Sequence, residues 1–329
     1  MRLMIATPGL AESGDDPAPD SWPVLPALGS LLHRARPLPR AAGWRAGVLA
    51  ALCPQTPVTA IPQAAMAARA AALPVGTPLC LATPLHVVAG ISRVHLPPGG
   101  WLRLAPAEAA RWADLFNAQF GETALRLQAV AGEWLLLAPF AAAARDAAPE
   151  GLVGAPLVRA PARDAAERAL RRLGAEVEMW LSDQPLNRER EARGLPVINS
   201  FWFWGGAHAM ELPPCASPPR AMLVMGEADP WLAGLAAHCG LSLQPATDWR
   251  AVTACDDALL VLAPPPQGMT AAHWENLERQ WFEPAAAALR TGRVRTLRLQ
   301  VGSGAWQLPD ASPLRWLRRA RPWHQQVGA

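Results

Sequence analysis

The chain of 329 residues contains no lysine, since all 30 of its Lys and Arg residues are arginine, and it contains no tyrosine. Codons for lysine and tyrosine are AT-rich, so this absence indicates a GC-rich coding sequence and carries no functional information. No window approaches the roughly 20 uninterrupted apolar residues of a membrane-spanning helix. The apolar run at Met1–Thr7 is too short for a signal peptide and is followed by Pro8. The sequence therefore predicts a cytoplasmic protein without a membrane partner.

Cysteine and net charge exclude further classes. The five cysteines are an odd number, lie far apart and form no Cys-x-x-Cys pair, which predicts neither a disulfide framework nor a zinc knuckle and fits a reducing compartment. The net charge of +3 is too small to imply nucleic-acid binding without a clustered patch. The cysteines are Cys53, Cys80, Cys215, Cys239 and Cys255.

One basic cluster lies near the C-terminal end, where arginines alternate with tryptophans. Such an arrangement could hold a single nucleic-acid strand or another anionic partner. A solvated last helix followed by a frayed tail explains the same pattern. The residues are Arg315, Trp316, Arg318, Arg319, Arg321 and Trp323.

Apolar periodicity predicts an α/β protein with a real core, since 51% of the residues are hydrophobic and 17% are charged. Leu170, Leu173, Val177 and Leu181 lie on one face of a predicted helix over 163–181. A strand, a helix and a strand in succession over 221–262 indicate a mostly parallel sheet. Further strands are predicted at 2–7, 79–88, 93–96, 125–130, 133–140, 295–301 and 305–308, and further helices at 44–52, 64–72, 106–120 and 273–289.

The stretch Asn187–Gly206 sets three arginines before a turn and an aromatic strand. Arg188, Arg190 and Arg193 alternate with two glutamates, which is typical of a salt-bridged helix end. An arginine in such a run could equally hold a phosphate or carboxylate through two hydrogen bonds. Both interpretations remain open on the sequence.

This stretch resembles a segment of the cofactor-independent phosphoglycerate mutases, metal-dependent members of the alkaline phosphatase superfamily in which such a run leads into a Trp-x-Trp-Gly strand. The matching strand here is Trp202–Gly205. The helix and hairpin over 106–139 resemble a subdomain that the family inserts into its core. A set of bacterial regulatory proteins of the RpfE type is similar in the motif that ends at Gly194-Leu195-Pro196 and around Trp281-Phe282.

The resemblance implies an alkaline-phosphatase-like core over 1–74 and 197–329, with an inserted α+β subdomain over 75–196. In the active family this arginine run contributes to binding of the substrate phosphate. It therefore implies an anion site at Arg188, Arg190, Arg193 and Asn199. Trp202, Trp204, Gly205 and Gly206 are expected to be structural, although the glycine pair could also cradle an anion through backbone N–H groups.

The family uses two divalent metals (manganese, magnesium or zinc), held by Asp and His residues around a serine that carries the phosphoryl group. Where the family has an Asp-Gly pair after its first strand, this chain has Thr7-Pro8-Gly9. Ala263–Thr270 replaces a ligand loop, and Val301–Gly304 replaces an Asp-His pair. Ser30 is the one candidate nucleophile. These differences predict no catalytic residue and no bound metal.

Two remaining features have simple structural explanations. His86 and His95 are nine residues apart with no carboxylate beside them, which favours structural histidines over a metal pair. Asp256-Asp257 precedes a predicted strand and is expected to form a solvated cap rather than a catalytic dyad.

The sequence as a whole predicts a noncatalytic, mutase-like protein with a regulatory or scaffolding role. It would act through a protein partner or through a retained anionic ligand such as a phosphorylated small molecule. The alternative is an active metal-dependent mutase or phosphatase with two divalent metals. A second alternative is a nucleic-acid-associated accessory protein that uses the arginine and tryptophan tail.

Overall fold

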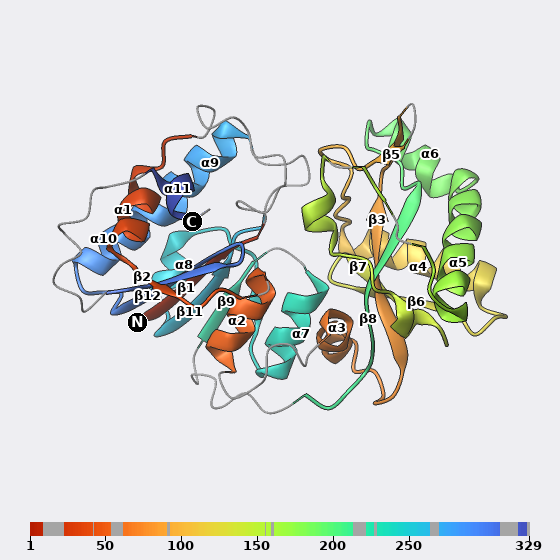
Figure 1. Ribbon diagram of the computed structural model, residues 1–329, viewed down its shortest axis with the longest axis horizontal. Coiled ribbons are helices and arrows are strands. Elements are labelled where there is room, and N and C mark those ends of the chain that lie inside the picture. Colours follow the sequence, from red (N-terminus) through yellow and green to blue (C-terminus); the bar gives the residue numbers. More distant parts are fainter. Residues whose placement is uncertain are drawn as a thin grey trace.

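The computed structural model describes residues 1–8, 23–41, 43–53, 62–90, 93–154, 156–158, 161–212, 222–226, 229–263, 270–309 and 322–327. Within these ranges the chain forms a large mostly parallel sheet, a smaller antiparallel sheet and a two-stranded hairpin, with helices packed around them (Figure 1). This arrangement confirms the predicted α/β class with a mostly parallel sheet. No helix of the described part is both long and apolar enough to cross a membrane.

The larger sheet has seven strands within the described residues. Five neighbouring strands run parallel, and the last two are antiparallel. Their apolar residues are buried because helices cover both faces, as is usual for parallel sheets. In sheet order the strands are β10 (Leu243–Gln244), β9 (Met222–Met225), β11 (Asp257–Val261), β1 (Arg2–Thr7), β12 (Thr296–Val301), β13 (Gly304–Leu308) and β2 (Arg36–Leu38).

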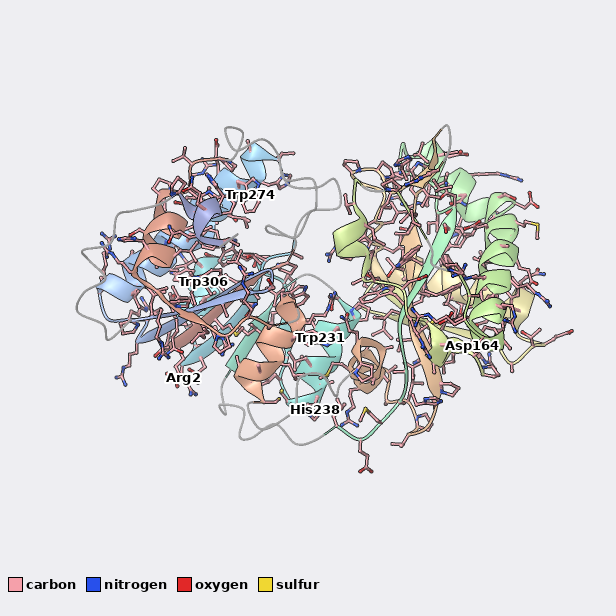
Figure 2. The ribbon with its side chains drawn as sticks, viewed as in Figure 1. Arg2, Asp164, Trp231, His238, Trp274 and Trp306 are labelled. Carbon is pink, nitrogen blue, oxygen red and sulfur yellow. The ribbon has the colours of Figure 1, made fainter. Side chains whose placement is uncertain are left out.

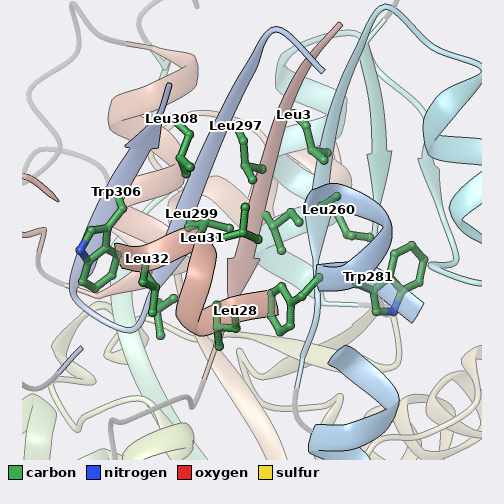
Figure 3. Packing of buried hydrophobic residues seen from close by; sticks show 14 of the residues in the cluster. Leu3, Leu28, Leu31, Leu32, Leu260, Trp281, Leu297, Leu299, Trp306 and Leu308 are labelled. Carbon is green, nitrogen blue, oxygen red and sulfur yellow. The ribbon is translucent and has the colours of Figure 1, made fainter. Parts of the chain in front are cut away.

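Alternate residues of β1 enter two different cores. Leu3 and Ile5 face the helices α1 (Pro26–Arg34), α9 (Ala271–Leu277), α10 (Glu283–Arg290) and α11 (Trp323–Val327). Figure 3 shows the leucines of α1 against Leu3 and Leu297 of the sheet. Met4 and Ala6 face α2 (Trp44–Leu52) and α7 (Pro230–His238). The short helix α8 (Trp249–Thr253) precedes β11.

One carboxylate that the sequence places in a solvated cap helps to fix this sheet. Asp257 is not a solvated cap as predicted, because it is buried and accepts two hydrogen bonds from the Arg2 guanidinium, at 2.9 and 2.7 Å. These hydrogen bonds lower the pKa of the Asp257 carboxyl. The ion pair joins the first residues of β1 and β11 and so helps to set their register.

A π-helical turn, Glu278–Phe282, interrupts the helix that the sequence predicts over 273–289. It turns the Glu278 carboxylate toward the start of α1, where it accepts hydrogen bonds from the backbone N–H groups of Ala27 and Leu28. The residue before α1, Leu25, provides no side-chain cap. Glu278 therefore satisfies N–H groups that would otherwise lack an acceptor, and burial raises its pKa.

The smaller sheet is antiparallel throughout. Ala131 and Gly132 have positive φ angles and form the predicted tight turn between two of its strands. Helices α4 (Pro106–Phe120), α5 (Ala165–Ser182) and α6 (Pro185–Ala192) pack on one face, and α3 (Gln63–Ala70) packs on the other. In sheet order the strands are β6 (Arg126–Val130), β7 (Glu133–Leu137), β3 (Pro78–Leu85) and β8 (Ser200–His208); β4 (Val88–Ala89) and β5 (Val94–His95) form the separate hairpin.

Strand β8 does not lie in the larger sheet. The sequence places its residues in the portion 197–329, whereas β8 pairs with β3 of the smaller sheet along almost its whole length. The chain therefore returns to the larger sheet only after His208, the last residue of β8. The division of the chain into a core and an inserted domain stays a prediction.

Helices α3 and α7 lie between the two sheets (Figure 1) and pack closely against each other. Gly234 of α7 permits this contact. A Cβ atom at this position would lie 1.9 Å from the carbonyl oxygen of Met66 and 2.6 Å from its carbonyl carbon. Because both atoms belong to the backbone of α3, no side-chain rotation can relieve the overlap.

We therefore expect Gly234→Ala to lower the free energy of unfolding by about 1–3 kcal/mol, the usual cost of overpacking. Gly29→Ala is the matched control, because Gly29 also lies inside a helix and its added Cβ would have its nearest neighbour at 3.9 Å. That control should be neutral or slightly stabilising, since alanine favours helices over glycine. Urea unfolding of both variants measures the difference, and equal effects would contradict the close packing of α3 on α7.

Candidate functional site

Ligands of open α/β sheets usually bind at the carboxyl ends of the parallel strands. At that edge Thr7 ends β1, and its hydroxyl donates to the Gln300 carbonyl of β12 at 3.4 Å. Both residues are buried. The Gln300 side-chain oxygen has no hydrogen-bond partner within the described residues. Nearby on β12, the half-buried Arg298 donates to the Gly47 carbonyl at 3.3 Å, and burial lowers its pKa.

A buried ion pair lies at the same edge. Asp229 caps the N-terminus of α7, directly after β9, and one carboxylate oxygen accepts from the Leu232 N–H at 2.8 Å. The other oxygen accepts from Arg45, in the first turn of α2, at 3.0 Å. Arg45 and Asp229 are each only 8% exposed. One carboxylate therefore acts both as a helix cap and as the counter-ion of a buried arginine.

Aromatic rings surround the Arg45 guanidinium and connect it to the smaller sheet. Its central carbon lies 4.6 Å from the ring centroid of Trp44 and 5.4 Å from that of Trp204 on β8. Trp44 in turn contacts Trp231 of α7, labelled in Figure 2, edge to face with ring centroids 5.4 Å apart. Cation–π contacts of this kind are strongest where water is excluded.

Hydrogen bonds extend this cluster into the smaller sheet. The Trp204 indole N–H donates to the Thr83 hydroxyl at 2.9 Å, and that hydroxyl donates to the Glu133 carboxylate at 2.8 Å. All three residues are buried. A continuous set of contacts thus runs from Asp229 through Arg45 and Trp204 to Glu133, from one sheet to the other.

This arrangement has limited chemical capacity. Within the described residues no group of three or more His, Cys, Asp or Glu side chains is placed to hold a metal ion. Burial raises the pKa of Cys239 to about 11, so this thiol is not a thiolate nucleophile near neutral pH. Cys53 is disulfide-bonded, whereas Cys80, Cys239 and Cys255 are present as thiols.

The three arginines predicted to form an anion site do not face the same way. Arg190 is buried, forms an ion pair with Glu108 of α4 and donates to the Pro196 carbonyl at 2.7 Å. Arg188 and Arg193 are exposed. The periodicity of α6 could have separated them, because Arg190 follows Leu186 by one helical turn and shares its buried face.

The other residues of the predicted site make contacts within the protein. The Asn199 side chain accepts from the Val87 N–H and donates to the Val87 carbonyl, both at 2.8 Å. Trp202 donates to the Ala147 carbonyl at 2.8 Å. The Gly206 N–H donates to the Ala144 carbonyl at 2.7 Å. Gly205 has a φ of +63°, a conformation that favours glycine.

Several other predicted positions fall elsewhere. Ser30 is exposed in the middle of α1 rather than in a turn that opens a helix. His86 is hydrogen-bonded to the Val197 carbonyl through its ring nitrogen at 3.0 Å. Trp323 is buried and donates to the Pro23 carbonyl at 2.9 Å, so its ring is not available for stacking on a base. Residue 9, the loop over 264–269 and the tail arginines lie outside the described residues.

No family model matches the chain, and no curated protein sequence matches it. Among solved structures, the PH0037 protein from Pyrococcus horikoshii aligns over 98% of this chain and 91% of its own, with a TM-score of 0.52 and 13% identity. The cofactor-independent phosphoglycerate mutase from Thermoplasma acidophilum aligns over 94% of this chain and 90% of its own, with a TM-score of 0.40 and 16% identity. At these identities the likeness to PH0037 concerns the fold alone.

We expect Arg45→Gln to lower the free energy of unfolding by about 3–5 kcal/mol, because it leaves the Asp229 carboxylate buried without its counter-ion. Arg111→Gln is the control, since Arg111 forms a comparable pair with Glu189, at 2.9 Å, on the exposed surface. Exposed pairs contribute little, so this variant should unfold nearly as the wild type does. Denaturant unfolding measures both, and similar losses would show that the burial of Arg45 does not matter.

Proposed function

We propose that the chain is a noncatalytic protein with a phosphoglycerate-mutase-like fold, which acts in regulation or as a scaffold. We further propose that it retains a site for an anionic ligand, with a phosphorylated small molecule as the expected class. A protein partner would bind the form of the chain in which this site holds its ligand. These proposals combine the resemblance of Asn187–Gly206 to the mutases with the distribution of charge in the structure.

The observation that carries the noncatalytic proposal is the set of side chains at the carboxyl edge of the larger sheet. A pair of divalent metals requires several carboxylate or imidazole ligands. In the described part of this edge, Thr7 and Gln300 are neutral, and the Asp229 carboxylate already accepts hydrogen bonds from Arg45 and Leu232. These residues do not fit a two-metal phosphoryl-transfer site.

The exposed arginines at the end of α6 support the anion site. Between them, Glu189 is bonded to Arg111 through two hydrogen bonds at 3.0 and 2.9 Å. Within the described residues, neither the Arg188 nor the Arg193 side chain forms an ion pair or hydrogen bond, so their donors can bind a phosphate. The buried ion pair of Arg190 with Glu108 holds α6 against α4, so the helix that positions Arg188 and Arg193 is fixed in place.

The first test is an assay for interconversion of 2- and 3-phosphoglycerate, with manganese, magnesium and zinc each added in turn. We expect no turnover above the protein-free rate and no stoichiometric metal in the same sample, because the edge lacks a ligand set. A known mutase assayed in parallel shows that the conditions support the reaction. Turnover with bound metal would refute the noncatalytic proposal and favour the active mutase.

The second test measures binding of 3-phosphoglycerate by isothermal titration calorimetry. We expect Arg188→Gln with Arg193→Gln to weaken binding about tenfold or more, the effect of losing charge-assisted hydrogen bonds. Arg250→Gln with Arg295→Gln is the control, because both arginines are exposed and the change in net charge is the same. Equal losses in the two double variants would reduce the effect to bulk charge and contradict a site on α6.

A further inference from the structure

A groove of about 520 Å³ runs along α5, whose N-terminal end is marked by Asp164 in Figure 2. Its other walls are the turn between α4 and β6, at Thr123–Leu125, and the segment after β7, at Pro139 and Phe140. The volume lies within the range of small-molecule sites. The groove is lined by none of the α6 arginines and by no residue of the larger sheet.

The floor of the groove is apolar. Leu125 and Leu173 belong to the core of the smaller sheet, and the half-buried Phe140 packs against the same core. Ala165 and Ala169 contribute only small side chains from α5, which leaves space above this floor. A ligand that reaches the floor would cover chiefly the half-exposed ring of Phe140, since Leu125 and Leu173 are only 9% and 2% exposed.

Two arginines of α5 line the groove one helical turn apart. Arg168 and Arg172 are both exposed, and like charges at this spacing destabilise a helix. Within the described residues, neither side chain forms an ion pair or hydrogen bond, and Glu176, one turn further along, forms none with Arg172. On another flank of the helix, by contrast, Glu167 lies 3.7 Å from Arg145. Because Glu176 also lines the groove, the lining carries two positive charges and one negative charge, which leaves it net positive.

We propose that this groove binds an amphipathic anion: a carboxylate or phosphate group carried on an apolar chain or ring. Arg168 and Arg172 bind the charged group, and the apolar part lies on Leu125, Phe140 and Leu173. Both elements are needed in this groove, because Glu176 in its lining offsets part of the charge of the two arginines. This site is separate from the anion site proposed on α6 and does not depend on whether the chain is catalytic.

Calorimetric titration with octanoate, octyl phosphate, n-octanol and inorganic phosphate tests the two halves of this chemistry. We expect octanoate or octyl phosphate, or both, to bind at one site per chain, and comparison of the two identifies the preferred headgroup. Octanol and inorganic phosphate should each bind about tenfold more weakly or worse, because each lacks one half of the interaction. Octanol binding as tight as octanoate, or inorganic phosphate binding as tight as octyl phosphate, would overturn the proposal.

Variants locate the site. Arg168→Gln with Arg172→Gln should weaken binding of the anion about tenfold or more while leaving octanol unaffected. Ala169→Trp should block the groove and remove binding of both, with every charge retained. Arg250→Gln with Arg295→Gln is the control, since it makes the same change in net charge at exposed arginines of neither proposed site and should not alter octanoate binding.

The proposals for the two anion sites are tested independently of each other. Loss of 3-phosphoglycerate binding only in the α6 variant would leave the groove untouched, and loss of octanoate binding only in the α5 variant supports the groove. Unchanged octanoate binding in the α5 arginine variant would overturn the groove site. Circular dichroism and thermal unfolding check each variant, and the arginine pair decides the matter if Ala169→Trp does not fold.

Discussion

The Arg45 guanidinium lies where the two sheets meet, bonded to Asp229 and placed over the rings of Trp44 and Trp204. A buried charge is tolerated only with a partner, because its desolvation cost is large. The positions of α2, α7 and β8 relative to one another are therefore linked through one side chain. The close approach of α3 to α7 at Gly234 lies in the same region between the sheets, so both contacts constrain how the sheets are placed.

The polar groups of this cluster are already hydrogen-bonded within the protein. At the edge of the larger sheet Asp229 accepts from two donors, and in the smaller sheet the Trp204 indole N–H donates to Thr83. Other arginines are exposed as well, but those of the two proposed anion sites, Arg168, Arg172, Arg188 and Arg193, lie on α5 and at the end of α6, next to the smaller sheet. An arginine that water can reach and that has no hydrogen-bond partner can bind an anion without first losing another contact. Both proposed anion sites thus lie on helices of the smaller sheet rather than at the edge of the larger one.

Local patterns predict most elements, because the spacing of apolar residues that marks a helix or a strand is visible among neighbouring residues. Helix α5 and the hairpin of β6 and β7 are examples. Helix α1 is not among the predicted elements, although Pro26 at its start and Leu28, Leu31 and Leu32 at helical spacing mark it. What no local pattern can show is its cap, Glu278, about 250 residues away. The sequence predicts β8 as a strand, but it does not indicate which of the two sheets this strand joins. Its partner β3 is set by tertiary packing rather than by local propensity.

The candidate sites differ in predictability for a similar reason. The outward direction of Arg188 and the inward direction of Arg190 follow from helical spacing, so the sequence alone could have divided the arginine run. The pairing of Arg45 with Asp229 joins residues 184 positions apart, and each looks like an ordinary residue at a helix end. Arg168 and Arg172 are visible in the sequence as neighbours on one helical face. Their role in the proposed site depends on the apolar floor formed by Leu125 and Phe140. Only the folded chain brings this floor next to the two arginines.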